Sequence, residues 1–370
     1  MKELFMAIFH LFKGMWYFVS FIRSLILNLL FLALIGIILF AIYKPSEKVV
    51  VEKNNILKLS IAGNIVEEKS QKENIDAALG ELSGLSRQVR ETPLQDILDT
   101  ITSAKADPGI VGILLDLEDM GRAGINQLAV IGETLNQFKE SGKPVIAAED
   151  NYNQSQYYLA SFADKVFIHP MGSVHMGGFG LYRLYYQEAL EKLKINYHVF
   201  RVGSYKSAVE PFLRNSMSPE DRNQSRTWLS ALWTNYVDDV ARQRNIEPDS
   251  VRRYINRVPA NLAENGGDLA KLALNTKLVD TIATHSEVNQ YLSNISGPDS
   301  DKGFRYVTYS NYSKQVQFSY NEQGAIQDTV ALIVADGTIM PGQSRDGFIG
   351  SDTIADLLIQ ARKTSHIKAV

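Results

Sequence analysis

The lysine best placed to carry chemistry in this sequence is Lys206, because of the residues that precede it. Residues 197–202 alternate apolar and polar side chains, which predicts a short strand. Gly203 interrupts the pattern, and Ser204 is a candidate cap for the segment that follows. A strand, a glycine turn and a reactive side chain at the start of the next segment are a common arrangement for a catalytic group. The pattern alone is not specific, because most lysines are solvated surface residues.

Other candidate groups have simpler explanations. Ser204 and Ser207 flank Lys206, and either could orient its amine, but capping is the favoured interpretation of both. The glycine-rich residues 177–180 lack the preceding strand and following helix that phosphate-binding loops require. The six histidines show no metal-ligand spacing and no His–Asp–Ser set, and cysteine is absent. The sequence therefore predicts neither a metal nor a cofactor.

The elements that would position Lys206 alternate between strands and helices. Strands are predicted at 56–66, 110–117, 145–148, 166–169 and 278–282, and helices at 94–104, 126–140, 155–163, 181–193 and 269–274. This order predicts an α/β fold with parallel strands. Ser218 and Pro219, followed by two acids, mark the start of a long helix beyond the lysine. Residues 304–318 are predicted to form a strand or a connector.

The amino terminus differs in kind from the rest of the chain. Residues 24–43 carry no charge, and about 20 residues are enough to span a bilayer as a helix. The run is too long for a signal peptide and no small-x-small cleavage site follows it, so an uncleaved anchor is favoured. The excess of basic residues before the run places the amino terminus in the cytoplasm and the body outside. Residues 1–21 are predicted to form an amphipathic helix on the membrane surface.

Two parts of the body resemble each other. The aligned stretches are 57–66 with 331–340, and 97–105 with 354–362. Gly63 then lies over Gly337. The matching strand runs to Leu117 in the first copy, whereas in the second the chain stops at Val370, partway into the strand. We therefore expect a fragment of a longer, two-repeat protein with an anchor at 1–45, a first repeat at 46–320 and the start of a second at 326–370.

The chain resembles the long, two-repeat form of the signal peptide peptidase A (protease IV) family. The resemblance rests on the single anchor, the tandem repeat, and the segments QYYLASFADK (156–165), VFRVGSYKSAVEPF (199–212) and MSPE (217–220). It implies a ClpP/crotonase-like fold of repeated β-β-α units and a Ser–Lys dyad that degrades signal-peptide remnants. It implies that Lys206 is the general base and that the nucleophile serine lies beyond Val370, so that this chain alone is inactive. Aligned on Tyr157 and Tyr158, Gln154 and not Ser155 lies over that serine, and Ser155 is interpreted as a helix-start residue.

A lysine serves as a general base only when it is neutral. With a reference pKa of about 10.4, well under about 1% is neutral at pH 7.5. Lowering that pKa by about three units costs on the order of 4 kcal/mol, which burial away from water and carboxylates supplies. The apolar neighbours Tyr205, Ala208, Val209 and Phe212 could provide such burial once a second domain packs over them. Backbone N–H groups would then hold the oxyanion.

The resemblance also implies partners and a location. Expected partners are hydrophobic peptides, the membrane and further copies of the chain, and the expected location is the bacterial inner membrane with the body in the periplasm. A formal net charge of −3 gives no indication of a nucleic-acid partner. A noncatalytic anchored scaffold and a crotonase-like acyl-CoA enzyme are the alternatives. A glycine pair and a serine beside glycines in the sequence past Val370 would favour the peptidase over the scaffold.

Overall fold

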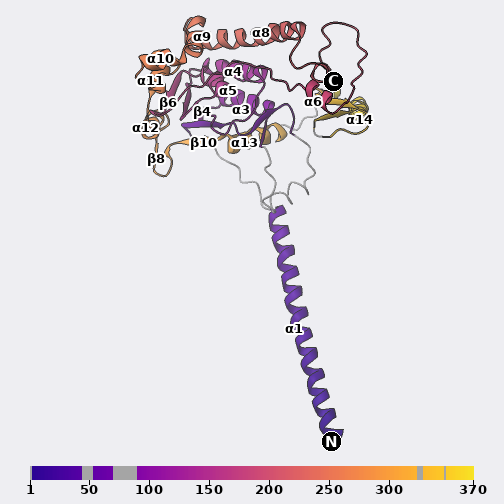
Figure 1. The fold of residues 1–370 in the computed structure, drawn as a ribbon. Coiled ribbons are helices and arrows are strands. Elements are labelled where there is room, and N and C mark those ends of the chain that lie inside the picture. Colours follow the sequence, from indigo (N-terminus) through magenta and orange to yellow (C-terminus); the bar gives the residue numbers. More distant parts are fainter. Residues whose placement is uncertain (1, 44–52, 70–89, 323–327, 346) are drawn as a thin grey trace. The chain divides into compact units, whose positions relative to one another are not determined.

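The computed structural model describes residues 2–43, 53–69, 90–322, 328–345 and 347–370 (Figure 1). The chain divides into two compact units, Met1–Val49 and Val50–Val370. In the first unit, the two predicted amino-terminal pieces form one continuous helix, α1 (Lys2–Tyr43). Within α1, Lys13–Ala33 is long and apolar enough to cross a membrane by length and composition, and none of that stretch is buried in the structure. A signal sequence meets the same criterion.

A six-stranded parallel sheet forms the centre of the second unit, with strand order β10-β1-β4-β5-β6-β7. Its strands are β1 (Asn55–Ser60), β4 (Ile110–Asp116), β5 (Val145–Glu149), β6 (Lys165–Ile168), β7 (Thr281–Ile282) and β10 (Tyr306–Thr308). The helices between successive inner strands are α3 (Leu94–Ala106), α4 (Ile125–Lys139) and α5 (Gln154–Ala160). The sheet and this alternation confirm the predicted α/β class.

Both faces of the sheet are covered, which explains why its inner strands read as continuous apolar runs. One face contributes Leu57, Ile113 and Val145 to the larger core, which also contains buried residues of α3, α4 and α8 (Pro219–Arg244). The other face contributes Ile56, Leu114 and Ile146 to a smaller core. That core is closed by Val288 and Leu292 of α12 (His285–Ser296).

The remaining helices follow the main sheet strands or connect them. They are α6 (Gln187–Lys192), α7 (Glu210–Leu213), α9 (Pro248–Asn256), α10 (Val258–Glu264), α11 (Leu269–Asn275) and α13 (Tyr309–Glu322). The helix predicted at 181–193 is wrong in its first half, because α6 begins only at Gln187. Residues 304–318 were predicted to form a strand or connector, yet most of them lie in α13. Short strands β8 (Pro298–Asp299) and β9 (Gly303–Phe304) pair antiparallel before β10.

The strand predicted at 197–202 is wrong. The structure has no regular element between α6 and α7, and no described strand pairs with these residues. Phe200 is 99% exposed and Val202 85% exposed, so the alternating apolar side chains have no core to face. A strand is stabilised by a paired neighbour and a covered face, and this segment has neither among the described residues.

The strand pairings near the carboxyl end repeat those at the start of the body. β1 pairs in parallel with β4, and β2 (Asn64–Val66) pairs in parallel with β3 (Glu91–Pro93). In the same way β11 (Thr329–Val330) pairs with β14 (Ile367–Ala369), and β12 (Thr338–Met340) pairs with β13 (Phe348–Gly350). A helix of 13 residues precedes the second strand of the outer pair in both cases, α3 in one and α14 (Ser351–Lys363) in the other.

Candidate functional site

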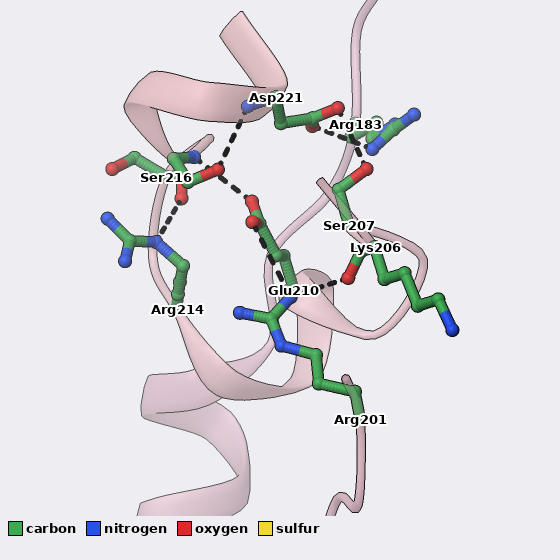
Figure 2. A network of polar contacts seen from close by, with 9 residues as sticks. Arg183, Arg201, Lys206, Ser207, Glu210, Arg214, Ser216 and Asp221 are labelled. Atoms are coloured by element: carbon green, nitrogen blue, oxygen red, sulfur yellow. Dashed lines mark hydrogen bonds and ion pairs between the residues drawn. The ribbon is translucent and has the colours of Figure 1, made fainter. Parts of the chain in front are cut away.

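Lys206 lies in the irregular segment between α6 and α7, three residues after Gly203. Gly203 has a φ of +105°, which supports the predicted turn at this position. The lysine is exposed, and Figure 2 shows its side chain extending away from the neighbouring carboxylates. Within the described part of the chain, no hydrogen-bond or ion-pair partner is found for its Nζ atom. The amine is therefore free to meet a partner from another part of the protein.

The apolar side chains near Lys206 do not cover it. Tyr205 is 57% exposed and Ala208 is also exposed. Phe212 is half-buried, because its ring stacks on Tyr197 at a centroid distance of 4.7 Å and on Tyr186 at 6.1 Å. Burial of Lys206 by these residues together with a second domain therefore stays a prediction.

Two buried carboxylates hold the lysine segment against the start of α8. Glu210 is 1% exposed and Asp221 is 3% exposed. One Asp221 oxygen accepts a 2.8 Å hydrogen bond from the Ser207 hydroxyl, and the other accepts a 2.9 Å bond from Arg183 (Figure 2). Glu210 accepts a 3.0 Å hydrogen bond from the backbone N–H of Ser218. The segment is thus tied down by side chains rather than by backbone pairing.

Arg201 links this pair of carboxylates to the lysine itself. Its guanidinium donates a short hydrogen bond to the backbone oxygen of Lys206 and lies 4.0 Å from a Glu210 oxygen (Figure 2). The side chain of Arg201 is only 34% exposed, so the ion pair is partly shielded from water. The carbonyl of the candidate base is therefore fixed by a cation that also neutralises a buried acid.

The environment of Glu210 favours its ionised form. Burial, the largest single effect, raises the pKa of this carboxyl, but the hydrogen bonds from Ser218 and the positive charges of Arg214 and Arg201 together lower it below its ordinary value. The positive charges of Arg214 and Arg201 therefore help to stabilise the ionised carboxylate of Glu210. Tyr185 lies in the field of both carboxylates, since burial and the charges of Asp221 and Glu210 raise the pKa of its phenol.

The serines considered as alternatives have separate roles. Ser204 caps no helix, contrary to the prediction, because α7 begins only at Glu210 with Val209 at the capping position. Ser207 does not cap a helix either, since its hydroxyl donates to Asp221. The predicted cap of α8 is confirmed, as the Ser218 hydroxyl accepts a 3.1 Å hydrogen bond from the backbone N–H of Asp221.

The glycine-rich residues 177–180 contact the start of α5. Asn153 caps α5 by accepting from the backbone N–H groups of Ser155 and Gln156, which agrees with the interpretation of Ser155 as a helix-start residue. The side-chain oxygen of Gln154 accepts hydrogen bonds of 3.1 and 2.8 Å from the backbone N–H groups of Gly177 and Gly178. These two glycine N–H groups thus bind a side chain of the protein itself.

A separate cavity of about 700 Å³ opens where the strands of the main sheet end. Glu149, at the end of β5, lines it and accepts a short hydrogen bond from the backbone N–H of Leu117. Burial above all, with the nearby charges of Asp116 and Glu118, raises the pKa of Glu149 to about 8, against the lowering effect of the Leu117 bond and Lys58. Among the described residues, no group of three or more His, Cys, Asp or Glu could hold a metal ion.

Sequence reasoning did not assign Glu210, Arg201 or Arg183 to this site. Arg201 and Glu210 both lie inside the quoted segment 199–212, and an acid between apolar residues was the available signal for a buried carboxylate. Asp221 was noticed only as an acid in the first turn of a helix. Its contact with Ser207 spans 14 residues, which the sequence pattern does not reveal.

Residues 137–295 match the family model described as peptidase family S49. The chain is 37% identical to Protease 4 of Salmonella typhi over 100% of this chain and 60% of that protein. It is 35% identical to Protease 4 of Haemophilus influenzae over 98% of this chain and 59% of that protein. A mutant of the 1510-N membrane-bound stomatin-specific protease aligns with a TM-score of 0.34 and 15% identity, covering 70% of this chain and 93% of that one. The chain thus spans about 60% of the length of these two curated relatives.

Proposed function

Because the chain belongs to peptidase family S49, the signal peptide peptidase A (protease IV) family, we propose that it is part of a membrane-anchored serine endopeptidase whose general base is Lys206. The observation that carries this proposal is the placement of Lys206. It lies inside the matched region 137–295, and its amine is exposed and unpaired among the described residues.

The proposed chemistry needs a serine that this part of the chain does not bring to Lys206. Among the described residues, no serine hydroxyl is hydrogen-bonded to the Nζ atom. We propose that the nucleophile is a serine outside residues 1–370, as the resemblance to the family implies. The neutral amine takes the proton of that serine while its oxygen attacks the scissile carbonyl, and backbone N–H groups bind the resulting oxyanion. The amine then donates the proton to the departing peptide nitrogen.

We further propose the organisation of the molecule around this site. The repeats at 46–320 and 326–370 are supported by the matching strand pairs β1–β4 with β11–β14 and β2–β3 with β12–β13. The apolar helix α1 supports an anchor in the inner membrane, with the amino terminus in the cytoplasm and the body in the periplasm. Substrates near a bilayer would be short hydrophobic peptides such as signal-peptide remnants. Homo-oligomers are the proposed assembly.

Substitution of the lysine in the full-length protein tests the proposal. We expect Lys206→Ala to lower kcat on a fluorogenic hydrophobic peptide by at least about 100-fold, since a positioned base contributes about that much or more. Circular dichroism should show an unchanged fold, because the side chain is exposed and its amine has no hydrogen bond or ion pair among the described residues. Lys192→Ala, an exposed lysine in α6, is the matched control and should retain full activity.

Two outcomes would contradict the proposal. Activity retained by Lys206→Ala would remove this residue from the mechanism. Absence of turnover by the wild-type full-length protein, together with no labelling by a serine-reactive fluorophosphonate, would favour the noncatalytic scaffold instead.

A further inference from the structure

We propose that Arg201 and Ser207 are positioning residues for Lys206, which hold its backbone on the buried carboxylates of Glu210 and Asp221. This inference rests on the proposed role of Lys206 as the general base. It adds a reason why the amine can be presented free of a counter-ion in a segment that has no regular secondary structure.

The two contacts lie on adjacent residues of the chain. Arg201 holds the backbone oxygen of Lys206, and the hydroxyl of Ser207 donates a 2.8 Å hydrogen bond to Asp221 (Figure 2). The peptide unit that joins Lys206 to Ser207 is therefore fixed at its oxygen and at the following side chain. The amine of Lys206 itself has no hydrogen-bond or ion-pair partner among the described residues.

Both carboxylates are tied to the start of α8: Asp221 lies in its first turn, and Glu210 of α7 is hydrogen-bonded to its N-cap residue Ser218. The backbone N–H of Ser218 donates to Glu210 at 3.0 Å, while the Ser218 hydroxyl accepts from the backbone N–H of Asp221 at 3.1 Å. Asp221 is itself part of α8, which runs from Pro219 to Arg244 and packs its buried residues into the larger core. The backbone at Lys206 is thus held in place through contacts with α8, although its own segment has no regular secondary structure.

Charge pairing explains why the acids do not capture the lysine. A carboxylate within about 4–6 Å of an ammonium group stabilises the charged form, which cannot act as a base. Here Arg183 binds Asp221 at 2.9 Å, and Arg201 lies 4.0 Å from Glu210. The charged and titratable groups of this network are Arg183, Tyr185, Arg201, Glu210, Arg214 and Asp221. Three guanidinium groups therefore face two carboxylates, and neither acid requires Lys206 for charge balance.

Substitution of Arg201 in the full-length protein should lower turnover, because Arg201 holds the backbone oxygen of Lys206. We expect Arg201→Gln to lower kcat about 10- to 100-fold with KM within about twofold, because a small displacement of a catalytic group costs about that much. We also expect the pH of half-maximal kcat to rise by about one unit, since Glu210 loses a cation and becomes available to the lysine. Arg201→Lys should recover part of the lost kcat.

A second substitution separates the two effects of Arg201. In the double variant Arg201→Gln with Glu210→Gln, the pH of half-maximal kcat should return toward the wild-type value while kcat stays low, because the free carboxylate has been removed. Ser207→Ala should lower kcat about 3- to 10-fold on its own, as it removes one hydrogen bond to Asp221. Ser207 lies outside any helix or strand, so we expect Ser207→Ala to fold. Its kcat then tests the positioning role if Arg201→Gln does not fold.

Matched controls distinguish this inference from the proposed function. Arg252→Gln breaks ion pairs with Asp238 and Asp249 elsewhere on the surface and should leave kcat and its pH profile unchanged. If Lys206→Ala is inactive while Arg201→Gln and Ser207→Ala match wild type in kcat and pH profile, the positioning role is overturned and the general base stands. If Lys206→Ala is active, the proposed function itself fails.

Discussion

At the scale of single residues, the candidate base is supported by polar groups rather than by apolar ones. Burial was expected from Tyr205, Ala208, Val209 and Phe212 once a second domain packs over them, and among the described residues Tyr205 and Ala208 are exposed. Glu210 and Asp221 are the buried groups of this region instead. A buried carboxylate is stable only when hydrogen bonds and cations satisfy it, so these two acids fix the geometry of every group that pairs with them.

The carboxyl of Glu149 makes the stability of the fold depend on pH. Its pKa is raised from an ordinary 4.5 to about 8, so folding favours the protonated form. This stabilisation is complete below pH 4.5 and is lost as the pH rises through about 8. We expect Glu149→Gln, which cannot ionise but keeps an acceptor for Leu117, to be more stable than wild type at pH 9 and nearly equal to it at pH 5.

Urea unfolding at the two pH values measures this difference. The gap in the free energy of unfolding should grow by about 2–4 kcal/mol between pH 5 and pH 9, at about 1.4 kcal/mol per unit of pKa. Glu133→Gln, on the exposed face of α4, serves as the control and should show no such growth. A pH-independent gap for Glu149→Gln would mean that the carboxyl is already ionised in the folded protein.

At the scale of elements, the sequence predicted the strands and helices correctly where the local hydrophobic pattern agrees with the burial in the structure. The runs at 110–117 and 145–148 and the helices around them were predicted close to their observed bounds, because both faces of the sheet are covered. Residues 197–202 have the alternation of a strand but no paired neighbour, and a period of two in the sequence does not reveal whether a partner exists. The network beside Lys206 was not predictable either, since it joins α7 and the start of α8 to irregular segments on both sides of α6.

Helix α4 contains a glycine that packing requires. Replacing a helix-interior glycine by alanine ordinarily stabilises a helix by about 1 kcal/mol. At Gly132, however, a Cβ atom would lie 2.4 Å from the ring of Phe162. We expect Gly132→Ala to lower the free energy of unfolding by about 1–3 kcal/mol through overpacking, measured by urea denaturation.

The pairing of these two residues provides the control. Adding Phe162→Leu to Gly132→Ala should recover part of the loss, although Phe162→Leu alone is destabilising because Phe162 is 3% exposed. Additive effects of the two changes would show that the ring and the glycine do not restrict each other.

At the scale of the whole molecule, α1 is a unit of its own. The first compact unit ends at Val49, and the apolar stretch Lys13–Ala33 has no buried residue. If it is an anchor, a double change of Leu25→Arg and Leu29→Arg should move the protein from the membrane pellet to the supernatant after a carbonate wash, because each arginine costs about 2.5–3.5 kcal/mol at the centre of a membrane helix.

The matched control replaces both leucines by isoleucine and should stay in the pellet. Wild-type protein recovered entirely in the supernatant, with an amino terminus that begins after residue 43, would show that α1 is removed as a signal sequence. Protease protection tests the proposed location. A protease added to the outside of intact spheroplasts should digest the body and spare the amino terminus.

The order of strands in the main sheet also has a consequence for synthesis. β1 pairs on one side with β10, so that Ile56 lies beside Tyr306 and Leu57 beside Val307. The edge of β1 that pairs with β10 therefore stays open until about 250 more residues have left the ribosome. An open edge of this kind can pair with other chains. A nascent molecule would thus expose this strand edge for most of the synthesis of residues 56–306, and the main sheet would be complete only when the three-residue strand β10 arrives.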